Sequence, residues 1–187
     1  MSSASGAPPP LPPPPPPPPP ASMPPPPRPS APKAPIVAPK GPEGAFRVEL
    51  LVFNGHPFKD HWSYWVRSHR DHDIGVLIHA TGDVRSGFQF EIKRNYNVKE
   101  SSRAPMERIP LQWIDSKYFD EKATFSNGVP KEDCVPVCAF EVSVHSIKVP
   151  GKTLNSVDDA IVESADQLVK DRIFDKKVAD FLHAKEQ

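Results

Sequence analysis

Hydrophobic positions from Phe46 onward recur with a period of two, which is typical of β-strands. The stretch Ser86 to Asn95 (SGFQFEIKRN) alternates most clearly, with Phe and Ile on one face and Gln, Glu and Lys on the other. Such alternation predicts a half-buried strand. The same approach predicts five further strands, over Phe46–Phe53, His61–Val66, Ile74–Ala80, Arg108–Ile114 and Ala139–Val149. In the last of these, Phe140, Val142 and Val144 would face inward.

After Pro150 the period of the apolar positions changes to about 3.6 residues, which predicts helices. The first helix has one apolar face and begins near Ser156, where Ser156 and Asp159 resemble a capping box. The second follows Asp175, its expected cap. The inward positions of the two helices are Ile161, Ala165, Leu168 and Val169, then Val178, Phe181 and Leu182. Strands followed by helices predict an α+β fold, with a small antiparallel sheet and two C-terminal helices.

The first 43 residues have a different composition. Of the 27 prolines in the 187-residue chain, 21 lie within the first 42 residues, and Pro12 to Pro20 are consecutive. Such a segment has too few large apolar side chains to offset the entropy lost on folding. We therefore expect a disordered proline-rich arm over residues 1–43 and one α+β domain over residues 44–187.

Polyproline adopts an extended helix that docks into aromatic-lined grooves. Pro24 and Pro27, followed by Arg28, match the spacing and flanking charge that SH3 domains prefer, and the tract around Leu11 resembles ligands of profilin or WW modules. The alternative is that the arm is only an extended linker.

Charge and cysteine content exclude several classes of protein. The chain has 23 basic and 23 acidic residues, and a nucleic-acid-binding domain normally carries a basic excess. The first 30 residues do not predict a signal peptide, and the sequence has no apolar run long enough to span a membrane. Cys134 and Cys138 are the only cysteines. The expectation is a soluble cytoplasmic protein without a cofactor.

Two histidines lie within otherwise apolar strands. His61 opens HWSYWV, and His79 follows GVLI. If these strands pair antiparallel, both imidazoles meet at one edge of the sheet, an arrangement suited to general-base catalysis. The alternative is that two histidines at strand ends are half-exposed and have no chemical role.

The His-Trp strand that starts at His61 and the strand that ends at His79 resemble those of the lecithin-retinol acyltransferase-like group, which are circularly permuted papain-like relatives of NlpC-type peptidases. The segments Val48–Asn95 and Ile161–Phe174 are also similar to uncharacterised fungal proteins that share this layout. The resemblance implies a permuted papain-like fold in which His61 is the general base and His79 orients it. It also implies a nucleophilic cysteine at the start of a downstream helix.

At the position of that cysteine this chain has Asn155-Ser156. Ser156 is therefore one candidate nucleophile, although a helix N-cap is the commoner role for such a serine. Cys134 and Cys138 are the others, with a structural role as the alternative. A transcript variant that lost the cysteine explains the sequence with the fewest assumptions. The leading hypothesis is a catalytically degenerate domain that acts by binding, and the alternative is a thiol- or serine-dependent acyl hydrolase or acyltransferase using His61.

A metal site has little support in the sequence. His69, Asp71, His72 and Asp73 crowd one loop and are possible ligands, but a solvated polar turn is the commoner reason for such a cluster. Cys134 and Cys138 have no second ligand pair at zinc spacing. The sequence therefore predicts no metal.

The arm hypothesis predicts that a peptide of residues 1–43 binds an SH3, WW or profilin-type module. Groove recognition depends on the spacing of the prolines, so a peptide of the same composition with scrambled spacing should bind more weakly. Calorimetric titration of both peptides measures this difference. Equal affinity of the two peptides would contradict recognition by a groove.

Overall fold

The computed structural model describes residues 32–57, 59–83, 87–148 and 156–186, with the side chains of residues 83 and 156–158 left aside. Within these ranges the chain forms a six-stranded antiparallel sheet in the order β5-β1-β2-β3-β4-β6. The strands are β1 Phe46–Phe53, β2 His61–Arg67, β3 Ile74–Asp83, β4 Gly87–Asn97, β5 Glu107–Ile114 and β6 Lys131–Asp133. The helices are α1 Glu121–Thr124, α2 Ala139–His145, α3 Ser156–Lys170 and α4 Lys176–Glu186, with 3-10 turns at Ser116–Tyr118 and Ser126–Gly128.

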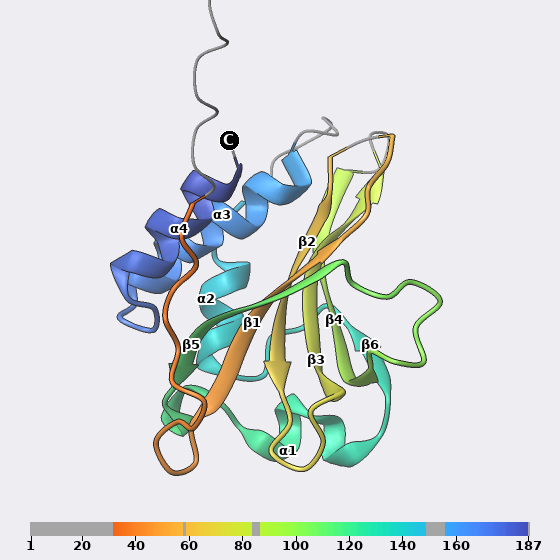
Figure 1. The fold of residues 1–187 in the computed structure, drawn as a ribbon. Helices are drawn as coiled ribbons and strands as arrows, with labels where there is room; N and C mark the ends of the chain where they lie inside the picture. The colour runs from red at the N-terminus through yellow and green to blue at the C-terminus, as the bar shows by residue number, and fades with distance from the viewer. Residues whose placement is uncertain (1–31, 58, 84–86, 149–155, 187) are drawn as a thin grey trace, which may run out of the picture. The chain divides into compact units, whose positions relative to one another are not determined.

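The helices α2, α3 and α4 lie on one side of the sheet (Figure 1). Alternate strand residues, such as Tyr64 and Ile78, point to this side and form one apolar core with Ile161 and Leu168 of α3. These side chains are completely buried, so the helix-side face of the sheet is closed to solvent. In the described part of the chain, no helix is long and apolar enough to cross a membrane.

The predicted strands from Phe46 to Ile114 and the two C-terminal helices are confirmed. The segment after Cys138 is a correction, because residues 139–145 form helix α2 and not a sixth strand. The buried residues there are Phe140, Glu141, Ser143 and Val144, a helical spacing, whereas Val142, expected to face inward, is 56% exposed. The alternation of apolar and polar residues suggested a strand with Glu141 facing solvent, but Glu141 is buried although it is charged.

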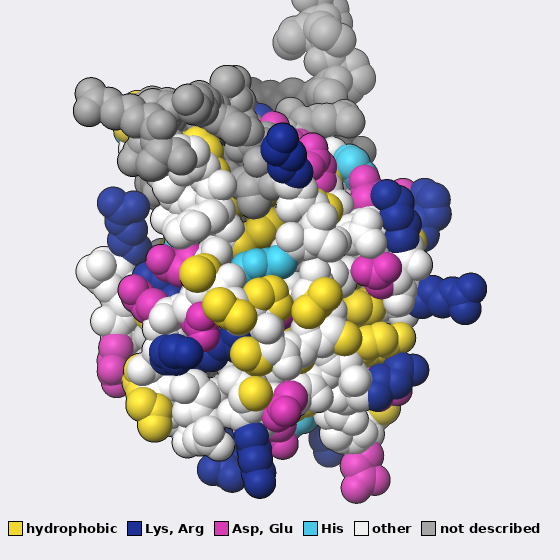
Figure 2. Space-filling model, turned by 180° about the vertical axis from the view of Figure 1, so that it is seen from behind, with side chains coloured by type: hydrophobic (Ala, Val, Ile, Leu, Met, Phe, Trp, Pro, Cys, Tyr) yellow, Lys and Arg dark blue, Asp and Glu magenta, His cyan; other side chains and the backbone are white. Residues whose placement is uncertain are grey.

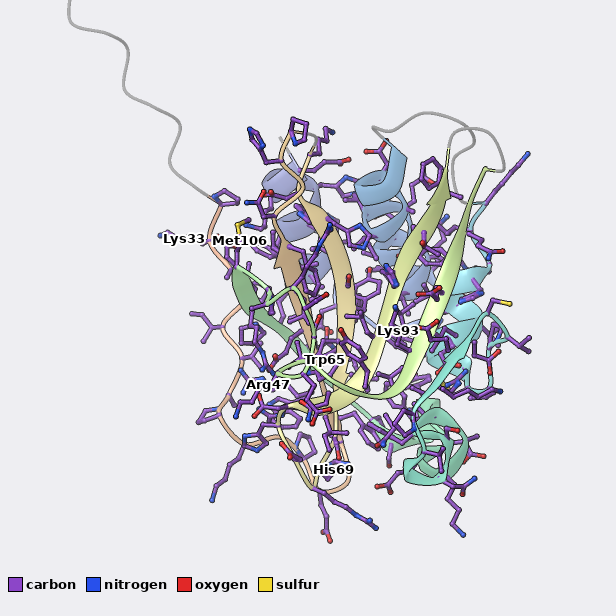
Figure 3. All side chains as sticks on the ribbon, turned by 90° about the vertical axis from the view of Figure 1, so that its right-hand side faces the viewer. Lys33, Arg47, Trp65, His69, Lys93 and Met106 are labelled. Carbon is purple, nitrogen blue, oxygen red and sulfur yellow. The ribbon has the colours of Figure 1, made fainter. Side chains whose placement is uncertain are left out.

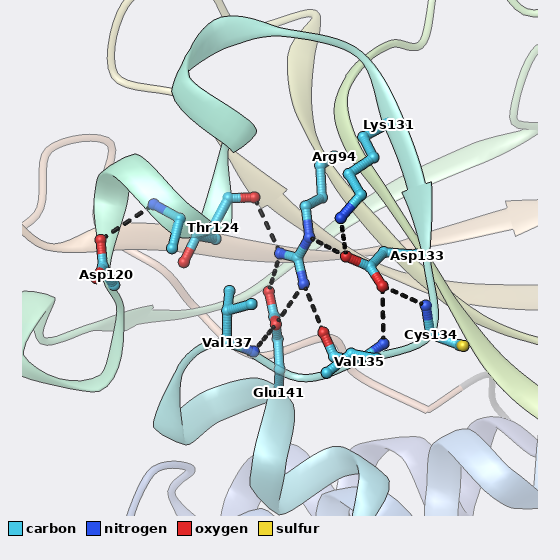
Figure 4. A network of polar contacts seen from close by, with 10 residues as sticks. Arg94, Asp120, Thr124, Lys131, Asp133, Cys134, Val135, Val137 and Glu141 are labelled. Atoms are coloured by element: carbon cyan, nitrogen blue, oxygen red, sulfur yellow. Dashed lines mark hydrogen bonds and ion pairs between the residues drawn. The ribbon is translucent and has the colours of Figure 1, made fainter.

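Glu141 is buried because it pairs with Arg94 of β4 (Figure 4). Two parallel hydrogen bonds join the guanidinium to the carboxylate, Nη1 to Oε1 at 2.7 Å and Nη2 to Oε2 at 2.9 Å. Arg94 also donates to the carbonyl oxygens of Thr124 and Val135, at 3.1 and 3.0 Å. A charge removed from water is tolerated only with such partners. The pair therefore fixes α2 and the chain around β6 against the sheet.

The packed part of the chain includes residues before Gly44. Trp113 of β5 donates its indole N–H to the carbonyl oxygen of Ala38 at 2.8 Å. Gly41 lies so close to this indole that an added Cβ would be 2.2 Å from the ring, so only glycine fits there. On the face of the molecule seen in Figure 2, acidic and basic side chains are interspersed, in keeping with the equal totals of the two charges.

Removing one member of the buried pair should strongly destabilise the domain. Glu141→Ala leaves the Arg94 guanidinium buried without its carboxylate, and we expect the free energy of unfolding to fall by about 3 to 5 kcal/mol. Val142→Ala, on the exposed side of the same helix, is the matched control and should change it by less than about 1 kcal/mol. Urea denaturation measures both. A loss for Glu141→Ala as small as the control would show that the pair is not needed.

Candidate functional site

The face of the sheet opposite the helices carries a row of polar residues set by the strand register. Ser63 of β2 lies directly across from His79 of β3, and His79 lies directly across from Glu91 of β4. Side chains on neighbouring strands at such positions point to the same face. Trp65 and Lys93 belong to this face, and Figure 3 shows both of them with the helices behind the sheet.

Three side chains on this face form a hydrogen-bonded chain. His61 Nε2 lies 2.8 Å from His79 Nδ1, and His79 Nε2 lies 3.0 Å from Glu91 Oε1. The two imidazole rings meet edge to face. The antiparallel pairing of β2 and β3 thus brings the two histidines together, as the sequence pattern predicts. Glu91 completes the chain, and Lys93 contacts the same carboxylate oxygen at 3.2 Å.

Burial makes both imidazoles neutral at neutral pH. It lowers the pKa of His61 to about 4, with smaller contributions from the neighbouring His79 and from the charge of Arg103. Burial also lowers the pKa of His79, although the contact with Glu91 opposes this effect. Burial works to raise the pKa of Glu91, but hydrogen bonds from His79 and Lys93 outweigh it, so the pKa is lowered and the carboxylate is ionised.

These charge states fix the direction of the hydrogen bonds. The Glu91 carboxylate can only accept, so His79 carries its proton on Nε2 and donates to Glu91. A neutral His79 then accepts at Nδ1, and the donor to it is the Nε2–H of His61. The remaining ring nitrogen of His61, Nδ1, therefore has a lone pair. The chain from Glu91 makes His61 a hydrogen-bond acceptor or a proton acceptor.

A pocket of about 480 Å³ lies over these residues. His61, Ser63 and His79 line it together with apolar side chains, among them Phe53 and Leu77. Its charged lining residues are Lys59, Asp60, Lys93 and Arg103. Pockets of this size, with few polar groups on an apolar wall, are typical of small-molecule sites.

The loop between β1 and β2 forms one rim of this pocket. It begins with Asn54-Gly55 and folds back so tightly that a Cβ on Gly55 would lie 1.7 Å from the carbonyl oxygen of Lys59. Asp60 Oδ1 accepts a hydrogen bond from the Gly55 N–H at 3.4 Å. Only glycine permits this close approach, which brings Lys59 and Asp60 to the pocket.

Ser63 is a polar group that sequence analysis missed. Its side chain is fully buried, and within the described structure its Oγ has no hydrogen-bond partner. A buried hydroxyl without a partner costs about 1 to 3 kcal/mol. Since Ser63 lines the pocket, a molecule bound there can supply the missing partner. Glu91 was also missed as a site residue, although its place on the polar side of an alternating strand was a usable signal.

The two cysteines lie away from the histidines, and both are free thiols. Cys138 is buried in the core on the helix side, where burial raises the pKa of its thiol to about 11. Cys134 is exposed just after β6 and lines a second pocket with Phe88 and His145. Neither cysteine is among the described residues that line the histidine pocket.

Ser156 is the first residue of α3, and its side chain is outside the described set. The helix packs against the face of the sheet that Tyr64 occupies, since Tyr64 Oη donates to the carbonyl oxygen of Ile161 at 2.8 Å. His61 lies an odd number of positions from Tyr64 along β2 and points to the opposite face. The structure therefore places α3 and the imidazoles on different sides of the sheet.

The other predicted site residues have separate surroundings. His69 packs its ring on Phe46 at 4.3 Å between centroids, and Asp73 pairs with Lys99 and Arg108. Within the described ranges no group of three or more His, Cys, Asp or Glu side chains is arranged to hold a metal ion. The expected partner-binding residues of the arm, Leu11, Pro24, Pro27 and Arg28, fall outside the described residues.

The fold and the pocket define an antiparallel α+β domain with a Glu-His-His chain on its open face. Residues 48–175 match a family of unknown function, DUF6540, and the chain belongs to this family. The matched segment includes His61, His79 and Glu91. No curated protein and no solved structure matches the chain.

The low pKa of His61 predicts that acid destabilises the fold. The unfolded chain binds a proton at His61 below about pH 6.5, whereas the folded chain does so only near pH 4. Stability from neutral His61 is thus complete above pH 6.5 and is lost as the pH falls toward 4. The expected loss between pH 7.5 and pH 4 is about 3 kcal/mol.

Urea unfolding at both pH values measures this loss. Carboxylates also titrate in this range, so the contribution of His61 is the difference between the wild type and His61→Asn. His72→Asn, at an exposed loop position, is the control and should follow the wild type. Parallel pH profiles for the wild type and His61→Asn would contradict a neutral, buried His61.

Proposed function

We propose that this domain binds a small molecule in the His61 pocket and does not catalyse acyl transfer. The proposal rests on two groups in one pocket. His61 Nδ1 is a hydrogen-bond acceptor because His61 Nε2 donates to His79, and the buried Ser63 Oγ has no hydrogen-bond partner in the described structure. The buried Ser63 hydroxyl lacks a partner, the lone pair of His61 Nδ1 can accept a hydrogen bond, and apolar side chains line the same pocket. A ligand with a polar group on an apolar body satisfies these demands.

The site is rigid in the way that a binding site requires. The His61 ring is held by its bond to His79, which is in turn held by Glu91, so the acceptor nitrogen is oriented before a ligand arrives. Groups held in this way lose little conformational entropy on binding. The strands beneath them are central to the sheet, and their opposite face is packed against the helices.

The same geometry argues against acyl transfer, because a nucleophile within reach of the base is lacking among the described residues. Nucleophilic catalysis needs such a group within hydrogen-bonding distance of the base. Ser63 Oγ makes no hydrogen bond to either imidazole, so neither ring activates it. The Cys138 thiol is protonated in the core on the other side of the sheet.

The second candidate function is an acyl hydrolase with His61 as general base. It is favoured by the chain from Glu91 through His79, which resembles the arrangement that orients catalytic histidines. The permuted papain-like relationship stays part of this proposal. Under this second proposal, a nucleophile at the start of α3 has to reach the imidazoles by passing around the end of the sheet.

Binding can be tested with 3-phenylpropan-1-ol, which joins a neutral hydroxyl to an apolar body. Its hydroxyl should bond to His61 Nδ1, and NMR titration should shift the signals of residues lining the pocket. His61→Ala and Ser63→Ala should each weaken binding roughly three- to tenfold, as expected for the loss of one hydrogen bond. His72→Ala is the matched control and should bind like the wild type. Absence of shifts at the pocket, or full affinity in His61→Ala, would overturn the proposal.

Catalysis is tested on the same proteins with ester, thioester and amide model substrates. The binding proposal expects that turnover does not depend on His61, so the wild type and His61→Ala should give equal rates. Turnover that disappears in His61→Ala and persists in His72→Ala would establish the acyl hydrolase instead.

A further inference from the structure

We propose that the natural ligand of the His61 pocket is a small amphipathic carboxylate, whose acid group is held by Arg103 and Ser63. This inference rests on the proposed binding function and adds the chemical class of the ligand. It depends on the balance of charges around the pocket, on the hydrogen-bonding capacity left unused there, and on the apolar wall.

The charged residues that line the pocket are mostly basic, since Lys59, Lys93 and Arg103 face a single acid, Asp60. Lys93 is already engaged, because its ammonium lies 3.2 Å from Glu91 and 3.0 Å from Glu132. Arg103 and Lys59 differ from Lys93, because neither has an ion-pair partner among the described residues, and of the two only Arg103 has a guanidinium that matches a carboxylate with two hydrogen bonds. An anionic ligand therefore meets at least one uncommitted positive charge.

Arg103 is well placed for this role. It lines the same pocket as His61, and its charge acts on that imidazole. Its side chain is exposed, so it can turn toward a ligand without disturbing the core. A guanidinium matches a carboxylate with two parallel hydrogen bonds, and such charge-assisted bonds are about twice as strong as neutral ones.

The unused hydrogen-bonding groups also fit an acid. Ser63 Oγ is a hydroxyl whose proton has no acceptor in the described structure, and a carboxylate oxygen can only accept. His61 and His79 are neutral, so they place no competing positive charge at the floor of the pocket. His61 Nδ1 accepts a hydrogen bond, which leaves room for a hydroxyl or N–H group near the acid.

The apolar part of the ligand has its own wall. Leu77 and Phe53 line the pocket and belong to a small apolar cluster with Leu51, Trp65 and Val98 on this face. Tyr96 packs against the same cluster and also lines the pocket. An aromatic or branched apolar body can cover these side chains while its acid group reaches Arg103.

Three probes of one shape test the charge of the ligand: 3-phenylpropanoate, 3-phenylpropanamide and 3-phenylpropylamine. NMR titration of the full chain gives a dissociation constant for each. The acid should bind roughly tenfold more tightly than the amide, as expected for one charge-assisted hydrogen bond gained. The amine should bind most weakly. Because the ion pair between the ligand carboxylate and Arg103 is partly exposed to solvent, the preference for the acid should decrease with added salt.

Variants separate Arg103 from the rest of the basic surface. In Arg103→Gln the acid and the amide should bind equally, whereas Arg103→Lys should keep part of the preference. Arg70→Gln removes another exposed arginine, in the loop between β2 and β3, and is the matched control that should keep the full preference. None of these exposed positions contributes to the core.

The outcomes distinguish this inference from the function on which it rests. If 3-phenylpropan-1-ol and the amide bind as tightly as the acid, the carboxylate inference is wrong and the binding function stands. An acid preference that survives in Arg103→Gln would also overturn the role of Arg103. If none of the probes shifts the pocket signals, both the ligand class and the binding function are wrong.

Discussion

The antiparallel register of β2, β3 and β4 is the constraint on which the site depends. It places Ser63 across from His79 and His79 across from Glu91, so one row of backbone pairs assembles the polar face. Side chains alternate along a strand, and a shift of one residue would turn this whole row toward the helices. The same shift would expose Tyr64 and Ile78, now fully buried, to solvent. The core that holds the helices therefore also fixes the geometry of the pocket.

The two faces of the sheet differ in how much apolar surface they bury. The helix side carries the large apolar core, and the Arg94–Glu141 pair closes it near β6. The open side has only a small apolar cluster beside the histidines, which leaves a pocket there. Partial burial on this side is sufficient to keep both imidazoles neutral, because a charged ring loses the stabilisation of water. The two neutral imidazoles and the ionised Glu91 together determine which nitrogen of His61 is a hydrogen-bond acceptor.

A histidine pair with an orienting carboxylate is compatible with catalysis or with binding, and its surroundings support the proposed binding function. Here the Cys138 thiol is kept protonated in the opposite core, and the buried Ser63 hydroxyl makes no bond to an imidazole. The uncommitted groups of the pocket, His61 Nδ1 and Ser63 Oγ, are those on which the proposed binding function rests. The histidines and Glu91 lie within the segment 48–175 that defines the family, so other members provide a natural set for comparing this pocket.

The sequence by itself determined the strands through Ile114, the two C-terminal helices and the meeting of His61 with His79, because period and turn residues are local properties of the chain. The sequence prediction was wrong at α2. There Glu141 can be buried because its carboxylate pairs with Arg94 of β4, which lies 47 positions earlier in the sequence. Glu91 and Ser63 were visible only as polar positions in alternating strands. Their roles depend on which residues lie across from them, and only the tertiary structure decided that, since register is set by the packing of one whole face against the helices.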